Sequence, residues 1–203
     1  MRLFTDISEW LVASKNDWCK PVKAHALAAA ILTLRPAIVV EIGVFRGGSF
    51  IPMAMAVREV GRGLAIAIDP WSAQASVEGQ AGANKEWWAS VNHDIVAKEF
   101  VEQIALLSLG EFVQVVRKRS DDAIVPAKID ILHVDGNHGE QAVKDVERFA
   151  PNVRVGGMVF MDDIGWDGGA VGRACERLLG MGFIKLYDMD TGAMFQRVGG
   201  ARA

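Results

Sequence analysis

Cysteine is scarce in this chain. Only Cys19 and Cys175 occur among its 203 residues, which is too few for a disulfide framework and does not supply the clustered thiolates of a zinc site. Isolated free cysteines are typical of proteins kept in a reducing compartment. We therefore expect a cytoplasmic protein with no cysteine-based metal centre.

Long apolar runs and an excess of one charge are also missing. No apolar stretch approaches the roughly 20 residues that cross a bilayer. The start, Met1 to Asp6, reaches an acidic residue before a signal-peptide core develops. The 22 basic and 25 acidic residues are intermixed, with a net charge of −3. Because phosphate backbones require a basic stripe, we expect neither a membrane nor a nucleic-acid partner.

No proline- or serine-rich linker and no charge run divides the chain. Its length suits one well-buried core, so we expect a single domain over residues 1–203. Residues 6–34 alternate polar and apolar positions with helical spacing, and Pro36 then ends the helical pattern. We predict an N-terminal helical cap over residues 1–35.

Short runs rich in Val and Ile follow the cap and alternate with helical segments, which is typical of a mainly parallel sheet with helices on both faces. Near the end, two runs are joined by only Asp190-Thr191-Gly192, which leaves no room for a crossover helix and predicts an antiparallel hairpin. The predicted fold is a Rossmann-like, doubly wound α/β sheet of seven strands. The predicted strands are 37–43, 64–69, 112–116, 129–135, 158–161, 183–189 and 194–198.

Three acidic residues fall at the ends of two of these runs. Asp135 follows Ile131 to Val134, and Asp162 and Asp163 follow Met158 to Met161. If the two runs are adjacent parallel strands, the carboxylates meet at one sheet edge and repel one another unless a cation joins them. We therefore predict a divalent metal site, with Mg²⁺ as the expected ion. The alternative is that these aspartates only cap the following helices.

A glycine-rich turn follows the first predicted strand. Gly43 and Gly47 let the backbone bend and approach a ligand, and a helix that begins near Ser49 would turn its free N–H groups toward it. Asp69 ends the next strand, where a carboxylate can accept hydrogen bonds from ribose hydroxyls. These features fit a dinucleotide or a sulfonium nucleoside. Glu41 within the strand and the absence of three-glycine spacing favour the sulfonium nucleoside.

From Ala37 to its end, the chain resembles the class I S-adenosylmethionine-dependent methyltransferases. The resemblance rests on Glu41, Gly43 and Gly47 as an acid-x-Gly-x-x-x-Gly motif, on Asp69 and on the terminal hairpin. The run 134–138 together with 162–163 is similar to the metal-dependent small-molecule O-methyltransferases, especially the macrocin O-methyltransferase group. The catechol and caffeoyl-CoA enzymes are more distant relatives.

The resemblance implies S-adenosyl-L-methionine as cofactor and assigns its contacts. Glu41 and Gly43 would line the methionine and ribose region, with Gly47 and Ser49 in the same turn, and Asp69 would bind ribose. Ser120 and Asp121 would lie near the adenine, and Asp135 would stand beside both cofactor and metal. Arg46 has no transferable role: it would pair with the methionine carboxylate or form a surface ion pair.

Methyl transfer from a sulfonium is an in-line displacement, so an enzyme has to align the acceptor oxygen and make it nucleophilic. A divalent ion held by Asp135, Asp162 and Asp163 would bind the acceptor hydroxyl and lower its pKa. His138 can take the hydroxyl proton as general base; an exposed loop residue or a metal ligand are the alternatives. We expect His133 to be a satisfied core histidine. The predicted acceptor is a small molecule: a sugar, a polyketide or a phenolic metabolite.

Residues 70–90 contain Trp71, Trp87 and Trp88 with little periodicity. A long loop in a compact domain is often functional, and aromatic side chains can cover a planar ring, so we predict a lid loop over the site. The alternative is that these tryptophans pack against the N-terminal helices or a second subunit. The abundance of Trp and Met in this region predicts a homo-oligomer, with a homodimer as its simplest form.

Two other functions fit a sheet of this kind. The first is an NAD(P)-dependent oxidoreductase, against which stand the glycine spacing, the antiparallel tail and the lack of a Tyr-x-x-x-Lys pair, since Tyr187 is the only tyrosine. The second is a non-catalytic, methyltransferase-like binding or assembly subunit, whose acidic residues would only cap helices.

Overall fold

Seven strands form one sheet in the order β3-β2-β1-β4-β5-β7-β6 in a computed structural model, which describes residues 2–16, 18–166, 169–189 and 191–200. Neighbouring strands are parallel except β7, which runs antiparallel to both β5 and β6. The predicted doubly wound sheet with its terminal hairpin is confirmed. Asp190, predicted in the hairpin turn, lies outside the described residues. The strands are β1 (Ile38–Ile42), β2 (Leu64–Ile68), β3 (Val113–Val116), β4 (Ile129–Val134), β5 (Val153–Met161), β6 (Phe183–Met189) and β7 (Gly192–Arg197).

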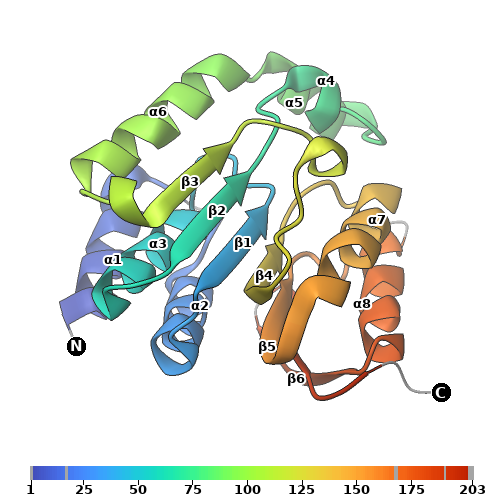
Figure 1. Cartoon of the computed structure of the whole chain (residues 1–203). Coiled ribbons are helices and arrows are strands. Elements are labelled where there is room, and N and C mark those ends of the chain that lie inside the picture. Colours follow the sequence, from blue (N-terminus) through green and yellow to red (C-terminus); the bar gives the residue numbers. More distant parts are fainter. Residues whose placement is uncertain (1, 17, 167–168, 190, 201–203) are drawn as a thin grey trace.

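Helices cover both faces of the sheet (Figure 1). The predicted N-terminal cap consists of two helices, α1 and α2, which pack with α3 and α6 on one face, whereas α7 and α8 cover the other. No helix in the described part of the chain combines the length and apolarity that a membrane span requires. The helices are α1 (Arg2–Ser14), α2 (Pro21–Leu34), α3 (Phe50–Val60), α4 (Ala73–Ser76), α5 (Gly82–Ser90), α6 (His93–Leu106), α7 (Glu140–Phe149) and α8 (Ala170–Gly180), with single 3-10 turns η1 (Gly110–Phe112), η2 (Ser120–Asp122) and η3 (Ala150–Asn152).

The central strands bury both faces, and alternate residues enter different core layers. Val39 packs in the layer under α1, α2, α3 and α6, while Val40 packs in the layer under α7 and α8. Period-two alternation then places Glu41 on the same face as Val39. His133 of β4 is directly opposite Glu41 in the parallel register. Two ionisable side chains are therefore buried side by side beneath the N-terminal helices.

Two segments differ from their sequence predictions. Residues 70–90 contain the short helices α4 and α5 in place of a loop, and neither helix has a buried residue, which explains the missing apolar periodicity. Strand β5 begins at Val153, earlier than predicted. The sequence did not indicate this first part because Gly156 and Gly157 interrupt the apolar pattern, at a register shift against β4. Gly156 has a φ of +77°, a conformation that glycine adopts without steric cost.

Candidate functional site

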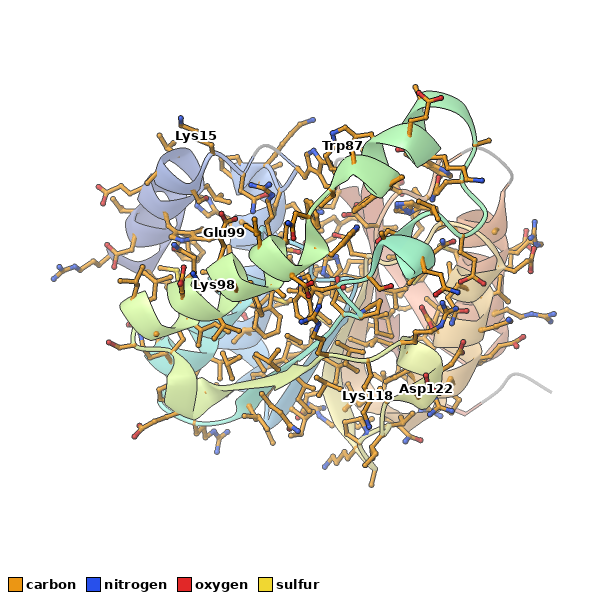
Figure 2. All side chains as sticks on the ribbon, turned by 90° about the horizontal axis from the view of Figure 1, so that it is seen from above. Lys15, Trp87, Lys98, Glu99, Lys118 and Asp122 are labelled. Carbon is orange, nitrogen blue, oxygen red and sulfur yellow. The ribbon has the colours of Figure 1, made fainter. Side chains whose placement is uncertain are left out.

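A cavity of about 670 Å³ opens at the carboxyl ends of the central strands. Its walls come from the loops after β1, β2, β4 and β5, from the segment between α1 and α2, and from α2 itself. Figure 2 views the molecule from above, toward this edge. Pockets of this size suit a cofactor or small substrate, and the carboxyl edge is where open α/β sheets bind ligands.

The loop after β1 forms one wall, and its glycines are required by geometry. Gly43 has a φ of +84°, and a Cβ atom there would lie 2.2 Å from the carbonyl oxygen of Asp135. At Gly47, with φ +80°, a Cβ would lie 2.8 Å from the ring of Phe100. Gly43 lines the cavity, whereas Gly47 does not. Gly43 thus lets the ends of β1 and β4 approach each other, and Gly47 lets the bend pack on α6.

Glu41 does not face the cavity. Its side chain is fully buried, and it accepts a hydrogen bond of 2.7 Å from the hydroxyl of Ser49. Ser49 lies at the cavity wall immediately before α3, where the sequence predicted a helix start. The cofactor contact predicted for Glu41 would therefore be indirect, through Ser49 and the position of the loop.

Asp69 holds the same loop through its carboxylate. Oδ2 accepts hydrogen bonds from the backbone N–H groups of Val44 and Phe45, both at 2.9 Å, and Oδ1 accepts one from Trp71 at 2.6 Å. Burial raises the pKa of Asp69, and these N–H groups offset only part of that rise. Asp69 also lines the cavity, together with the exposed Arg46. Their predicted contacts with ribose and with the methionine carboxylate stay predictions.

The predicted adenine contacts divide between the cavity and the surface. Ser120 is buried at the cavity wall, whereas Asp121 is exposed and is not among the lining residues. Gln141, which the sequence reasoning missed, donates through Nε2 to Ser120 and Asp121, each at 3.1 Å. A direct role at the adenine stays a prediction for Asp121 and for Ser120; Ser120 and Gln141 line the cavity.

The acidic residues after β4 and β5 converge as expected for adjacent parallel strands. The N–H of Asp135 donates to the carbonyl of Ile42 at 2.9 Å, and the N–H of Asp162 donates to the carbonyl of Val134 at 3.0 Å. The helix-capping alternative finds no support in the described part of the chain: the N-cap residues of α7 and α8 are Gly139 and Gly169, and at the start of α7 it is the Asn137 side chain, not Asp135, that accepts from the Gly139 N–H at 2.8 Å.

A lysine lies between the two carboxylates. The Nζ atom of Lys23, on α2, contacts Asp162 Oδ2 in a close ion pair and lies 3.4 Å from Asp135 Oδ2. Only 5% of the Lys23 side chain is exposed. Burial alone would lower the pKa of Lys23, but the attraction of Asp135 and Asp162 raises it by more than burial lowers it. The pKa therefore lies above its ordinary value, and the side chain is an ammonium. No sequence motif pointed to this residue.

Asp162 and Asp135 differ in how fully their oxygens are used. Asp162 Oδ1 accepts from the Thr191 hydroxyl at 2.9 Å and from the Asp163 N–H at 3.0 Å, while Oδ2 is held by Lys23. Burial raises the pKa of Asp162, but the Lys23 ammonium holds it below its usual range. The Asp135 side chain is 22% exposed at the cavity wall. Burial raises the pKa of Asp135 to about 8, although Lys23 opposes the rise.

Glu41 and His133 extend this cluster into the core. Glu41 Oε2 lies 3.4 Å from His133 Nδ1, and neither atom has a hydrogen-bond partner among the described residues. His133 is therefore a core histidine, but not the satisfied one that the sequence predicted. Burial lowers the pKa of His133, but the neighbouring Glu41 carboxylate raises it, so that it stays above its usual value. His133 Nε2 lies 3.9 Å from Asp135 Oδ2. Ligand atoms of Glu41, His133 and Asp135 lie within 4.8 Å of one another, which is a spacing compatible with one cation.

Asp163 points to a different partner. Its Oδ2 lies 3.2 Å from Nε2 of His138, whose ring centroid is 4.7 Å from that of Trp166. Burial lowers the pKa of His138, although Asp163 opposes the change, so the imidazole is neutral near pH 7. All three side chains line the cavity.

The predicted ligand set for a divalent ion is therefore already engaged. Asp135 and Asp162 hold Lys23, and Asp163 faces His138. A divalent ion does not fit among the three carboxylates while the ammonium occupies the space between two of them. Metal binding by this set stays a prediction that requires Lys23 to move.

An aromatic cluster borders the cavity on the side of the N-terminal helices. It consists of Trp18, Phe45, Trp87 and Trp88, with ring centroids 5.1 Å apart for Trp18 and Phe45 and 5.2 Å apart for Trp18 and Trp87. Trp18, Phe45 and Trp88 line the cavity, whereas Trp87, labelled in Figure 2, does not. The tryptophans of α5 thus pack against the N-terminal segment, as one of the two sequence interpretations expected, and the predicted lid role stays a prediction.

The family model described as Methyltransferase domain matches residues 40–164, from β1 to just beyond Asp163. The chain belongs to this methyltransferase family. The matched range includes the loop after β1, Asp69, Asp135, Asp162 and Asp163. A search of curated protein sequences found no significant match.

Solved structures share the methyltransferase fold at low sequence identity. The O-methyltransferase NovP is 18% identical with a TM-score of 0.68, covering 87% of this chain and 78% of its own. TomG from Streptomyces achromogenes, an O-methyltransferase solved with S-adenosylmethionine, is 16% identical with a TM-score of 0.65, covering 98% and 91%. The Podospora anserina methyltransferase PaMTH1, solved with S-adenosylhomocysteine, is 11% identical with a TM-score of 0.67, covering 97% and 88%. The fold is that of class I S-adenosylmethionine-dependent methyltransferases.

Proposed function

We propose that this methyltransferase transfers the methyl group of S-adenosylmethionine to a hydroxyl group of a small molecule. The observation that carries the proposal is that the bend after β1 and the carboxylates after β4 and β5 line one cavity of about 670 Å³. Such a cavity has room for a nucleoside cofactor and an acceptor together. The O-methyltransferases NovP and TomG, which share the fold, support the choice of oxygen as acceptor atom.

The cofactor is proposed to lie along the loop after β1. Gly43 gives backbone access there, and Asp69 and Ser120 would border the ribose and adenine ends. Arg46, whose guanidinium lies 5.6 Å from the Phe45 ring centroid at the cavity wall, would pair with the methionine carboxylate. The structures of TomG with S-adenosylmethionine and of PaMTH1 with S-adenosylhomocysteine support this cofactor for the fold.

His138 is proposed as the general base. If Nε2–H donates to the Asp163 carboxylate at 3.2 Å, Nδ1 is left as an acceptor that takes the proton of the acceptor hydroxyl. The oxygen then attacks the methyl carbon in line with the departing sulfur, and S-adenosylhomocysteine leaves. Asp163 holds the ring and stabilises the imidazolium that forms, and Trp166 packs against the same ring.

The acceptor is proposed to contain a ring. Trp18, Phe45 and Trp88 present aromatic faces to the cavity, and such faces bind planar or ring-shaped molecules. A phenolic, polyketide or sugar hydroxyl would satisfy this environment.

Calorimetry with S-adenosylhomocysteine is the first test. We expect binding at micromolar concentration, and its absence would remove the methyltransferase proposal. NAD⁺ and NADP⁺ serve as controls for the oxidoreductase alternative, which the family match and the antiparallel β7 disfavour. Labelled S-adenosylmethionine with a panel of catechols, phenols and sugars then tests transfer. If the protein binds the cofactor but transfers label to no compound of the panel, the result would favour the non-catalytic alternative.

A cytoplasmic location and a homodimer also stay proposals. The homodimer is motivated by the exposed Trp18 and Trp87 near the cavity rim, and light scattering of the purified chain tests it.

A further inference from the structure

The strongest unassigned feature is the ammonium buried in the acidic cluster. Lys23, on α2, contacts two acidic residues that follow different strands, Asp135 after β4 and Asp162 after β5. Its Nζ belongs to a row of neighbouring side chains in which acidic and basic residues alternate. That row is Glu41, His133, Asp135, Lys23 and Asp162.

The position of Lys23 is fixed by its helix. Pro21 begins α2, and Ala24, Leu27 and Ala28 bury the same helix against the core. A buried lysine without a partner would lose its charge, but here the close ion pair with Asp162, with Asp135 Oδ2 at 3.4 Å on the other side, retains it. Removing one member of such a network leaves uncompensated charge in a low-dielectric site, which is strongly unfavourable.

The same contacts explain why a divalent ion and Lys23 exclude each other. Carboxylates that converge at a sheet edge need a positive charge between them, and the Lys23 ammonium supplies it. Asp162 has no unused oxygen, since Thr191, the Asp163 N–H and Lys23 take both. A hard divalent ion requires several such oxygens at once.

We propose that Lys23 is the resident cation of this site, and that the protein folds and binds its nucleoside cofactor without a divalent metal. Lys23 is a positioning residue: by holding Asp135 and Asp162 it keeps the Asp135 carboxylate at the cavity wall. This departs from the metal dependence that the sequence resemblance implied. It does not require methyl transfer, because it concerns cation binding and side-chain placement.

The test is titration of MnCl₂ into the full chain, followed by electron paramagnetic resonance of free Mn²⁺. We expect no saturable binding by the wild type and no change in its melting temperature on adding EDTA. Lys23→Met should gain at least about tenfold in Mn²⁺ affinity, because a positive charge no longer opposes the ion. Lys23→Arg, which keeps the charge, should not gain it. Lys98→Met, on the exposed side of α6, is the matched control.

A double variant locates the gained site. Asp162→Asn in the Lys23→Met background should abolish the new Mn²⁺ binding. Saturable Mn²⁺ binding by the wild type that Asp162→Asn removes would overturn the proposal, as would a folded Lys23→Met that gains none. If Lys23→Met does not fold, the proposal is decided by comparing Mn²⁺ titrations of the wild type and of the Asp162→Asn single variant. Calorimetry with S-adenosylhomocysteine runs separately, so a missing cofactor site would remove the proposed function and leave the Lys23 result standing.

Discussion

Strand β4 carries an aspartate at each end, and the two are in opposite situations. Asp130, near the start, accepts hydrogen bonds from the backbone N–H groups of Ala37 at 2.8 Å and Ile38 at 2.9 Å, and it pairs with Arg154. Asp135, after the end, has the ammonium of Lys23 at 3.4 Å and an imidazole nitrogen at 3.9 Å.

Their pKa values move in opposite directions. Burial alone would raise the pKa of Asp130, but Arg154 and the two N–H groups lower it by more than burial raises it. The pKa therefore falls below its ordinary value. Burial dominates at Asp135 and raises its pKa to about 8. A carboxylate saturated by fixed donors stabilises the fold, whereas one left partly open beside a cavity is characteristic of a functional site. The amino end of the sheet is thus structural, and the carboxyl end holds the candidate chemistry.

The largest expected effect separates function from stability at the carboxyl end. His138→Gln should lower the methyl-transfer rate about 10²- to 10⁴-fold, because a general base contributes that much. S-adenosylhomocysteine affinity and melting temperature should stay unchanged. Initial rates with the acceptor found in the panel measure methyl transfer. Titration calorimetry measures S-adenosylhomocysteine affinity, and thermal unfolding measures the melting temperature. His25→Gln is the matched control, since His25 is not among the cavity-lining residues. A variant that kept its full rate would remove His138 as base.

Gly43→Ala should damage the contact between the ends of β1 and β4. The added Cβ would meet the Asp135 carbonyl at 2.2 Å in a left-handed conformation, which costs about 3 kcal/mol of folding free energy. Cofactor affinity should fall as well, because the cavity wall shifts. Urea unfolding measures the first effect. Gly61→Ala, with φ +75° and no atom within 4 Å, is the control for conformation alone. Equal losses in both variants would show that the close approach is unimportant.

Asp130→Asn tests the structural end. Loss of a charge-assisted hydrogen bond should cost about 1.5–3 kcal/mol in the free energy of unfolding at pH 7. Since the folded pKa of Asp130 is depressed, its contribution is present above the unfolded pKa of about 3.9 and is lost as the pH falls through the folded value. The wild type and the variant should therefore converge in stability in acid. Asp122→Asn, at the surface, is the control. A constant difference at every pH would contradict this assignment.

Much of this architecture follows from local patterns. The apolar runs located all seven strands, and the short spacing at 190–192 predicted the antiparallel hairpin, because strand burial and loop length are read directly from neighbouring residues. Convergence of Asp135 and Asp162 followed from the same reasoning, since adjacent parallel strands end at one edge.

What escaped prediction depends on contacts between distant segments. Lys23 is 112 positions before Asp135, and nothing near it indicates how α2 docks on the sheet. The Glu41 and His133 pair requires the register of β1 against β4. The helical form of residues 73–76 and 82–90 has no apolar stripe to signal it, because those helices bury no residue.

The smallest expected effect concerns the rim of the cavity, where the packing and lid interpretations of α5 differ. Trp87 contacts Trp18 and Trp88 but does not line the cavity, and it is 43% exposed. Trp87→Ala should therefore cost about 0.5–1.5 kcal/mol of stability, the value of an aromatic pair, and leave S-adenosylhomocysteine affinity unchanged. Trp88→Ala, which removes a cavity-lining ring, is the comparison. If Trp87→Ala weakened ligand binding as much as Trp88→Ala, α5 would act as a lid whose closed position depends on the whole aromatic cluster.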